Sequence, residues 1–256
     1  MVLRILVSFV VLTGAWELIV RVLGISCIIL PPPSLIFADL VSILTSGLIL
    51  QHFQATLLEI CVGFILGAVV GVLLGMAIAA WRLLDDLVYP YVVAFNSIPK
   101  VALAPLMVTW FGFGLSSKIV MALLMSFFPV LVNTIAGLRS VDAQQLELMR
   151  ALDASKWQVF LRVRIPSSLP YIFAGLEVGV IVSVIGAIVG EFMGASDGLG
   201  YLLVLYNSRL AVGSAFAILV ILGATGMLLH QIVVFARRRI VHWVPEEQEE
   251  VRITGV

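Results

Sequence analysis

The chain has 256 residues, of which 62% are hydrophobic and only 12% are charged, and its mean hydropathy is +1.17. One soluble core of this length cannot bury so much apolar surface, so the composition excludes an ordinary soluble domain and predicts an integral membrane protein. The formal net charge is zero, which gives no indication of a nucleic-acid partner.

Apolar runs long enough to cross a bilayer, about 20 residues each, define the predicted fold. It is all-α, a polytopic membrane protein with six transmembrane helices. The runs cover residues 3–23, 58–80, 87–111, 119–138, 171–193 and 212–235. We expect residues 1–256 to form a single transmembrane domain, with a core over 55–236 and a tail over 237–256. No A-x-A-like cleavage site occurs before Glu17 and Arg21, which favours a retained helix over a secretory signal.

Lysine and arginine residues concentrate at one side of the predicted spans. Most lie between the fourth and fifth spans and in the C-terminal tail, and Arg4 and Arg82 fall on the same side. Only Arg21, Lys118 and Arg209 lie opposite. Because basic residues near helix ends are retained in the cytoplasm, both termini and the segment between the fourth and fifth spans are predicted to be cytoplasmic.

The few cysteines and histidines indicate neither a disulfide nor a metal site. Cys27 and Cys61 are expected to be core thiols, because Cys61 falls at the start of a span. The histidines His52, His230 and His242 are too dispersed along the chain to suggest a set of metal ligands.

The second run contains the sequence GFILGAVVGVLLG, in which every fourth residue is glycine. These glycines are Gly63, Gly67, Gly71 and Gly75. One side of the helix is therefore nearly free of side chains, so another backbone can approach it closely, as it does at small-residue stripes of membrane helices. The stripe predicts helix packing, either with another helix of this chain or with a second subunit.

Three prolines divide the third run, VYPYVVAFNSIPKVALAPLMVTWFGFG: Pro90, Pro99 and Pro105. Each removes a backbone donor and kinks or interrupts a helix. Asn96, Ser97 and Lys100 cluster at the same place, and a lipid-exposed lysine at this depth costs about 2.5 to 3.5 kcal/mol. Lys100 must therefore face protein or water. We predict either part of a translocation path, since broken helices at membrane depth line cavities, or a structural pairing of Lys100 with Glu177.

Intramembrane polar residues supply the remaining candidates. The candidate residues of the translocation path are Asn96, Ser97, Lys100, Asn133 and Glu177. Glu177 lies well inside the fifth run, where a carboxylate is a functional-site hypothesis by default. Glu191 lies near the far end of that run, in GEFMGASDGLGYL, and is expected to reach the outer interface beside a glycine-rich turn rather than to contact substrate.

The charged segment over residues 140–166 carries helix signals of its own. Asp142-Ala-Gln-Gln145 has the spacing of a helix cap and its partner, and Ser155-Lys-Trp-Gln158 repeats that spacing. The spacing predicts two short helices. Pro166 and Pro170 are expected to end the segment before the fifth span.

Each of these two helices has an apolar stripe. The stripes consist of Leu146, Met149 and Leu152 in the first helix and of Trp157, Phe160, Leu161 and Val163 in the second. A simple connecting loop needs neither caps nor stripes, so we expect the segment to dock into a cytoplasmic partner. Burial of Trp157 would contribute about 1.5 to 3 kcal/mol to such docking. The alternative is a helix pair on the membrane surface, with its basic residues facing lipid phosphates.

The same segment resembles a known signature. Glu147, Asp153 and the stretch 163–166 match the spacing of the E-A-A, G and I-x-L-P signature of permease subunits in binding-protein-dependent ABC importers. Leu148 and Met149 stand where the signature has alanines. Asp153 stands at the glycine position of the turn between the helices, although Asp adopts a left-handed conformation less readily than Gly.

The resemblance extends over nearly the whole chain, most closely in IPKVALAPLMVTWFGFG, FFPVLVNTIAGLRSVD, KWQVFLRVRIPSSLPYIFAGL and VIGAIVGEFMGASDGLGYL. These stretches are similar to the nitrate, taurine and alkanesulfonate branch of such permeases, which also includes importers of thiamine pyrimidine precursors and of riboflavin. The resemblance implies a type I ABC importer permease (MetI-like) in the bacterial inner membrane, with cytoplasmic coupling helices.

The resemblance also implies partners. They are a second permease subunit, expected to be a copy of this chain, an extracytoplasmic substrate-binding protein and a cytoplasmic ABC ATPase dimer. ATP and Mg²⁺ would reside on the ATPase, and no cofactor is expected on this chain. The candidate ATPase-coupling residues are Glu147, Met149, Arg150, Leu152, Asp153, Ala154, Ser155, Trp157, Phe160 and Pro166.

The sequence itself supports this division of labour. No G-x-x-x-x-G-K-[ST] phosphate loop occurs in it, so this chain does not bind ATP by that route and the energy for transport must come from elsewhere; we do not expect an enzyme. An ion-coupled secondary transporter or channel is the alternative, because broken helices with intramembrane charges suit it as well. The sequence does not choose the cargo, which could be a nitrate-, sulfonate- or taurine-type anion or a vitamin precursor.

Overall fold

The computed structural model describes residues 2–47 and 49–243, and every regular element within these ranges is a helix. The longest are α3 (Ile49–Ala80), α6 (Leu115–Arg139), α9 (Ile165–Phe192) and α11 (Val212–Ile240). The others are α1 (Val2–Val22), α2 (Pro33–Thr45), α4 (Arg82–Asn96), the 3₁₀ turn η1 (Lys100–Leu103), α5 (Ala104–Phe111), α7 (Ala143–Ala151), α8 (Lys156–Val159), the π-helical turn η2 (Phe160–Arg164) and α10 (Leu199–Ser208).

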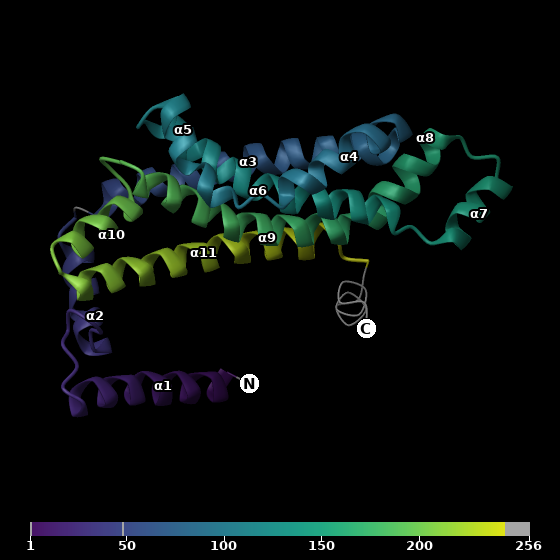
Figure 1. Cartoon of the computed structure of the whole chain (residues 1–256). Coiled ribbons are helices and arrows are strands. Elements are labelled where there is room, and N and C mark those ends of the chain that lie inside the picture. The colour runs from purple at the N-terminus through teal and green to yellow at the C-terminus, as the bar shows by residue number, and fades with distance from the viewer. Residues whose placement is uncertain (1, 48, 244–256) are drawn as a thin grey trace.

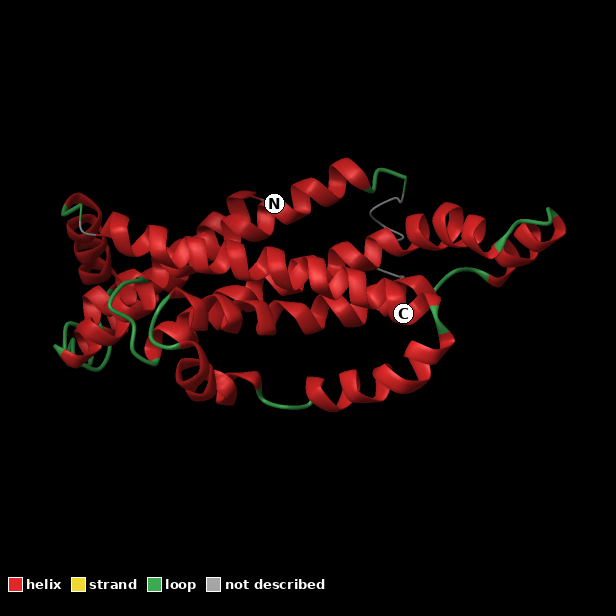
Figure 2. Cartoon of the chain, turned by 90° about the horizontal axis from the view of Figure 1, so that it is seen from above, coloured by secondary structure: helices red, strands yellow, loops and turns green. Residues whose placement is uncertain are grey.

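The long helices run side by side as an elongated bundle (Figure 1). The helices α7 and α8 project from one end, whereas α2 and α10 lie at the other. The view from above shows the same elongation, with loops gathered at the two ends (Figure 2). The start of α1 and the end of α11 point toward the end that carries α7. The cytoplasmic placement of both termini stays a prediction.

Among the described residues, four helices are long and apolar enough to cross a membrane, and the bent pair of α4 with η1 and α5 makes up to five. The remaining predicted span is α1, a helix of 21 residues. Its contacts are with α2 and, through Trp16, with Phe216 of α11 at a ring distance of 6.1 Å. That α1 crosses the membrane, which would complete the count of six, stays a prediction.

The core of the bundle is formed by α3, α6 and α9, which approach closely along glycine stripes. A Cβ atom at Gly63 would lie 2.5 Å from the Cβ of Ala122, and one at Gly186 would lie 2.8 Å from the Cα of the same Ala122. The glycines at 67, 71 and 75 also face α6. Thus α6 lies between α3 and α9, and the distances leave no room for a residue larger than glycine at these positions. Of the two possible partners of the glycine stripe, the structure shows a helix of the same chain.

The fifth run is longer than predicted, because one apolar helix extends from Lys156 to Phe192. The prediction that Pro166 and Pro170 end the insert is therefore wrong. In η2 the N–H of Ile165 donates to the carbonyl of Phe160, and this wider turn places Pro166 in the first turn of α9, where no N–H donor is needed. Pro170 is buried inside α9, where neighbouring helices accommodate the freed backbone groups.

The third run is broken once rather than three times. The segments α4 and η1–α5 meet at an angle of 89° around Ser97 to Pro99. Pro90 lies inside α4 without ending it, and Pro105 occupies the first turn of α5, where proline is tolerated. Only Pro99 stands at the interruption.

Two predicted boundaries also differ from the structure. The second span begins at Ile49, well before residue 58, because the polar residues of 51–59 belong to the first turns of α3. The helix α11 continues to Ile240, so the first residues of the predicted tail are helical. The rest of that tail, from residue 244, lies outside the described residues.

Candidate functional site

The coupling segment, which we define as residues 140–166, projects from the bundle as a helical hairpin (Figure 1). The side chain of Asp142 accepts a hydrogen bond from Gln144 N at 2.9 Å and begins α7. Ser155 and Gln158 form a reciprocal capping box, with distances of 3.3 and 2.8 Å, and begin α8. The first helix is separate as predicted, whereas the second continues through η2 into α9.

The turn between the helices is closed by Asp153, which has a φ of +52°. Asp153 N donates to the carbonyl of Arg150 at 3.0 Å, and Ala154 N donates to the carbonyl of Met149 at 3.0 Å. These two bonds are the Schellman arrangement that usually has glycine at the left-handed position. Asp153 thus adopts the turn that the glycine of the signature would adopt, with a conformational cost that glycine would not incur.

The tip of the hairpin exposes apolar side chains. Leu148, Leu152 and Trp157 are 62%, 67% and 66% exposed, and the ring of Trp157 stacks on Phe160 with 5.8 Å between centroids. The remaining predicted coupling residues lie on the same hairpin, exposed or half-buried: Glu147, Met149, Arg150, Asp153, Ala154, Ser155 and Pro166. The hairpin can therefore present an apolar surface with charged residues around it.

The break between α4 and η1 gathers three of the candidate path residues. Lys100 Nζ donates to the backbone carbonyl of Asn96 at 3.0 Å and to its side-chain oxygen at 3.1 Å. It also lies 4.7 Å from the ring centroid of Phe128 on α6. Ser97 donates to the carbonyl of Val93 at 3.2 Å. The lysine thus caps the carboxyl end of α4, an arrangement that the helix dipole favours.

The other two candidates lie elsewhere in the bundle. Glu177 pairs with Arg237 of α11 at 3.2 Å and lies 3.7 Å from Nε2 of His230. The suggested pairing of Lys100 with Glu177 is therefore wrong, because α11 supplies the partners of that carboxylate. Asn133 donates to the carbonyl of Pro129 at 2.8 Å within α6.

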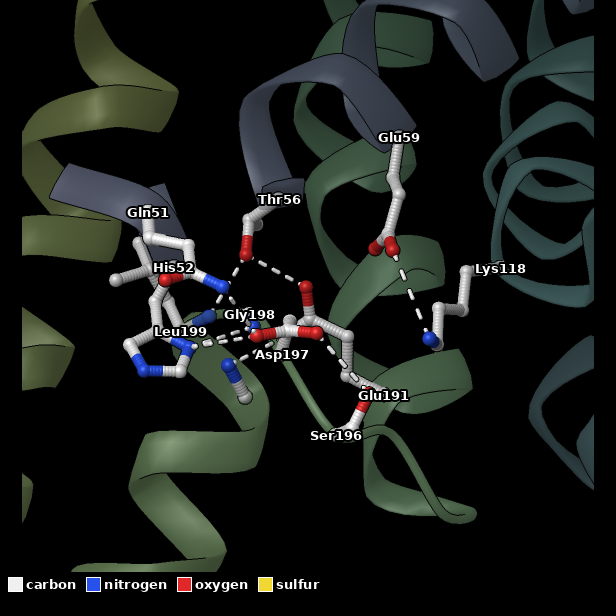
Figure 3. A network of polar contacts seen from close by, with 11 residues as sticks. Gln51, His52, Thr56, Glu59, Lys118, Glu191, Ser196, Asp197, Gly198 and Leu199 are labelled. Atoms are coloured by element: carbon white, nitrogen blue, oxygen red, sulfur yellow. Dashed lines mark hydrogen bonds and ion pairs between the residues drawn. The ribbon is translucent and has the colours of Figure 1, made fainter. Parts of the chain in front are cut away.

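A buried polar cluster at the opposite end of the bundle was not foreseen from the sequence (Figure 3). Thr56 and Glu59 of α3, Lys118 of α6 and Glu191 of α9 are each no more than 5% exposed. Thr56 donates to Glu191 at 2.5 Å and accepts from Leu199 N at 2.7 Å. Glu191 also accepts from Gly200 N.

This cluster holds the start of α10. The first N–H groups of the helix, on Gly198, Leu199 and Gly200, are bound by His52, Thr56 and Glu191 respectively. A carboxylate at a helix N-terminus satisfies unpaired donors and interacts favourably with the helix dipole. Glu191 lies beside the glycine-rich turn as expected, but its carboxylate is buried there, against Gly198 and Gly200, rather than exposed.

Glu59 and Lys118 form the second half of the cluster. Lys118 Nζ lies 3.8 Å from Glu59 Oε1, and neither carboxylate oxygen of Glu59 accepts a hydrogen bond from a described residue. A cavity of about 390 Å³ lies beside them, lined also by Gln51, Gln54 and Asp197. The oxygens of Glu59 are themselves sealed from solvent. We therefore regard the pair as a structural element that joins α3 to α6 rather than as a binding site.

The signal for this cluster was present in the sequence but incomplete. Glu59 lies in the second apolar run, and Lys118 directly precedes the fourth. Ionisable residues at such positions pair with one another or mark a functional site. That the two pair with each other could not be read from the sequence, and neither could the bond between Thr56 and Glu191, which are separated by 135 positions.

The comparisons with known proteins agree with the geometry. The model of the family described as "Binding-protein-dependent transport system inner membrane component" matches residues 67–242. The formylaminopyrimidine transport permease protein ThiX of Halalkalibacterium halodurans is 38% identical over 220 residues, which cover 86% of this chain and 87% of ThiX. The riboflavin transport system permease protein RibX of Chloroflexus aurantiacus is 34% identical over 237 residues, covering 93% and 88%.

A solved structure is also similar. A chain of the inward-facing methionine ABC transporter MetNI superposes with a TM-score of 0.62 over 78% of this chain and 96% of that chain, at 24% sequence identity. At this identity the likeness shows the fold alone.

Proposed function

Because the chain belongs to the family of binding-protein-dependent transport system inner membrane components, we propose that its coupling segment seats in a cytoplasmic ATPase subunit and transmits ATP-driven movement to the membrane helices. The chain is a permease subunit of an ABC import system, of the nitrate, taurine and alkanesulfonate branch. It is a multi-pass membrane protein of a transporter family rather than of an enzyme family. The ion-coupled alternative loses its support, since this family is defined by binding-protein-dependent import.

The observation that carries the coupling proposal is the continuity of the helix from Lys156 to Phe192. The exposed ring of Trp157 lies at its tip and the buried Glu191 near its far end. Because the helix is continuous through η2, a displacement at the tip is passed on to α9. Docking of the apolar tip into a groove on the ATPase would bury Trp157, which contributes about 1.5 to 3 kcal/mol.

The translocation path in this proposal is centred on the break between α4 and η1. Asn96, Ser97 and Lys100 lie together there, and irregular backbone at membrane depth is tolerated where it lines a cavity. Asn133 and Glu177 remain candidates at other heights of the bundle. No carboxylate of a described residue forms an ion pair with Lys100, which leaves its charge available to the path.

The partners follow from the same proposal. Two copies of this chain would pair, each with α1 as a sixth span and with both termini in the cytoplasm, and residues 1–256 would act as a single transmembrane domain. An extracytoplasmic binding protein would deliver the solute to the end that carries α10. ATP and Mg²⁺ would be bound by the ATPase dimer, without a cofactor on this chain.

The cargo in this proposal is a small polar solute. ThiX and RibX are named for a formylaminopyrimidine and for riboflavin, which favours a vitamin or vitamin precursor over a simple nitrate-, sulfonate- or taurine-type anion. The binding protein makes the first selection, so the ligand that copurifies with it identifies the cargo directly.

The docking proposal is tested with two substitutions in the assembled complex of permease, ATPase and binding protein. Trp157→Ala and Glu147→Arg should each abolish the stimulation of ATP hydrolysis by liganded binding protein, while the permease still inserts and pairs. Trp81→Ala is the matched control, because Trp81 is 62% exposed and stands between the end of α3 and the start of α4, outside the coupling segment. Normal stimulation in both coupling variants would refute the docking proposal.

A further inference from the structure

A side-chain clamp connects the end of α6, next to the coupling segment, to α4. Arg139 is the last residue of α6, and the coupling segment begins at the next position. Its guanidinium forms an ion pair with Asp85 of α4 and lies 4.7 Å from the ring centroid of Tyr89. Asp85 and Tyr89 are four positions apart, so they face the same side of α4. One arginine therefore contacts two residues on one face of the neighbouring helix.

Apart from this clamp, α4 is held to the bundle by apolar packing, and none of its other residues forms an ion pair with a described residue. Val92 is its only buried residue, and every residue of α4 is described. Val92 packs with Ile78, Leu131 and Ile135 near the ends of α3 and α6, and Leu84, Val88 and Tyr89 of α4 pack, partly buried, against the same cluster. The clamp therefore provides the polar attachment of α4 at the end near the coupling segment. The helices α3, α6 and α9, by contrast, are held together by close glycine packing.

The position of α4 gives the clamp mechanical importance. Its other end carries the 89° break with Asn96 and Lys100. When the coupling segment displaces the core helices α3, α6 and α9, the break changes position only if α4 moves with them. Because the chain turns by 89° at the break, a push along α5 is not directed along α4, and the force enters α4 at its start, where Asp85 and Tyr89 lie.

We propose that Arg139, Asp85 and Tyr89 form a tie that makes α4 follow α6 when the ATPase moves the coupling segment. The three are positioning residues for transport, and the proposal rests on the coupling function proposed above. The ion pair is partly exposed, with side chains 40% and 36% accessible. Such a pair alone contributes little, and the cation–π contact with Tyr89 adds a second attachment to the same guanidinium.

The experiment uses the full complex in proteoliposomes and measures solute uptake and ATP hydrolysis in the same vesicles. Asp85→Asn should lower the solute transported per ATP hydrolysed by about fivefold to tenfold, the size of modest coupling between two elements, while ATP hydrolysis continues. Asp86→Asn is the matched control, because the neighbouring Asp86 forms no ion pair among the described residues. The double variant Asp85→Arg with Arg139→Asp should recover most of the loss.

A distance measurement separates transmission from a general loss of stability. Spin labels at Leu87→Cys and Ala136→Cys, both exposed positions on α4 and α6, are introduced after both native cysteines are replaced by serine. In the unmodified clamp, trapping the ATPase with ATP and vanadate should leave the distance between the labels unchanged, because the helices move together. With Asp85→Asn, trapping should change or broaden that distance.

The outcomes are distinguishable. Unchanged transport per ATP in Asp85→Asn, or a fall of uptake and hydrolysis in the same proportion, would overturn the clamp proposal. A change of the distance on trapping in the unmodified protein would overturn it as well. Failure of the unmodified complex to couple ATP hydrolysis to uptake would instead refute the proposed function.

Discussion

Substitution of Gly63 by valine tests the close packing of the core most sharply. A Cβ at this position would lie 2.5 Å from the Cβ of Ala122, 2.8 Å from the carbonyl oxygen of Ile119 and 3.0 Å from Leu123 N. Two of these three atoms belong to the backbone, so rotation of a neighbouring side chain cannot relieve the clash. To restore ordinary contact, α3 and α6 must separate by about 1 Å. The opposite face of α6 offers no room, because Gly186 of α9 packs against the same Ala122.

The expected cost is about 3 kcal/mol. Overpacking a well-packed interior typically costs about 1 to 3 kcal/mol, and a gap of 0.5 to 1 Å forfeits about a quarter to a half of the dispersion energy of each contact along the interface. The better helix propensity of valine returns only a few tenths of a kcal/mol, approximately.

The assay is equilibrium unfolding of the purified permease in mixed micelles, followed by circular dichroism at increasing dodecyl sulfate. Gly223→Val is the matched control, because a Cβ at Gly223 of α11 meets no atom within 4 Å. The control should change the free energy of unfolding by less than about 0.5 kcal/mol. Equal effects of Gly63→Val and Gly223→Val would refute the inference that α3 and α6 are locked by glycine packing.

Three further predictions concern the buried cluster and the hairpin turn. Lys118→Met should lower the free energy of unfolding by about 3 to 5 kcal/mol, because it leaves the carboxylate of Glu59 buried without its ion-pair partner. Combining it with Glu59→Gln should recover most of that loss in the same assay. If the double variant recovers nothing, the pairing is contradicted. Thr56→Val removes the hydrogen bonds to Glu191 and to the start of α10, which should cost about 2 to 4 kcal/mol and increase proteolysis of the 194–198 turn; an unchanged cleavage rate would count against that anchoring. Asp153→Gly should stabilise the hairpin by about 1 kcal/mol, since it relieves a left-handed conformation, and a lower thermal midpoint would contradict this.

Local signals in the sequence predicted local structure well. Asp142 and Ser155 were identified as caps from their spacing alone, and both side chains accept the expected backbone hydrogen bonds. Caps can be predicted because donor and acceptor lie within three residues. The effect of Pro166 could not be predicted in the same way, since it depends on whether the preceding turn is α-helical or π-helical, which the spacing of the residues does not reveal.

Contacts between distant residues were the part that the sequence could not supply. Glu177 was visible as an intramembrane carboxylate, but its partners Arg237 and His230 lie on another helix, and nothing in the pattern distinguished them from Lys100. Likewise, the glycine stripe that includes Gly63 indicated a close approach without identifying the helix that makes it. Such pairings are set by the rotation of each helix about its axis, which hydropathy does not encode.

The central claim is that this permease moves solute only when a separate ATPase drives its coupling segment. The direct measurement is uptake of the ligand that copurifies with the binding protein, into proteoliposomes that contain the permease with or without the ATPase subunit. We expect uptake that requires both ATP hydrolysis and the ATPase, and that disappears with Trp157→Ala. Uptake at the same rate by the permease alone, driven by an ion gradient, would contradict the account.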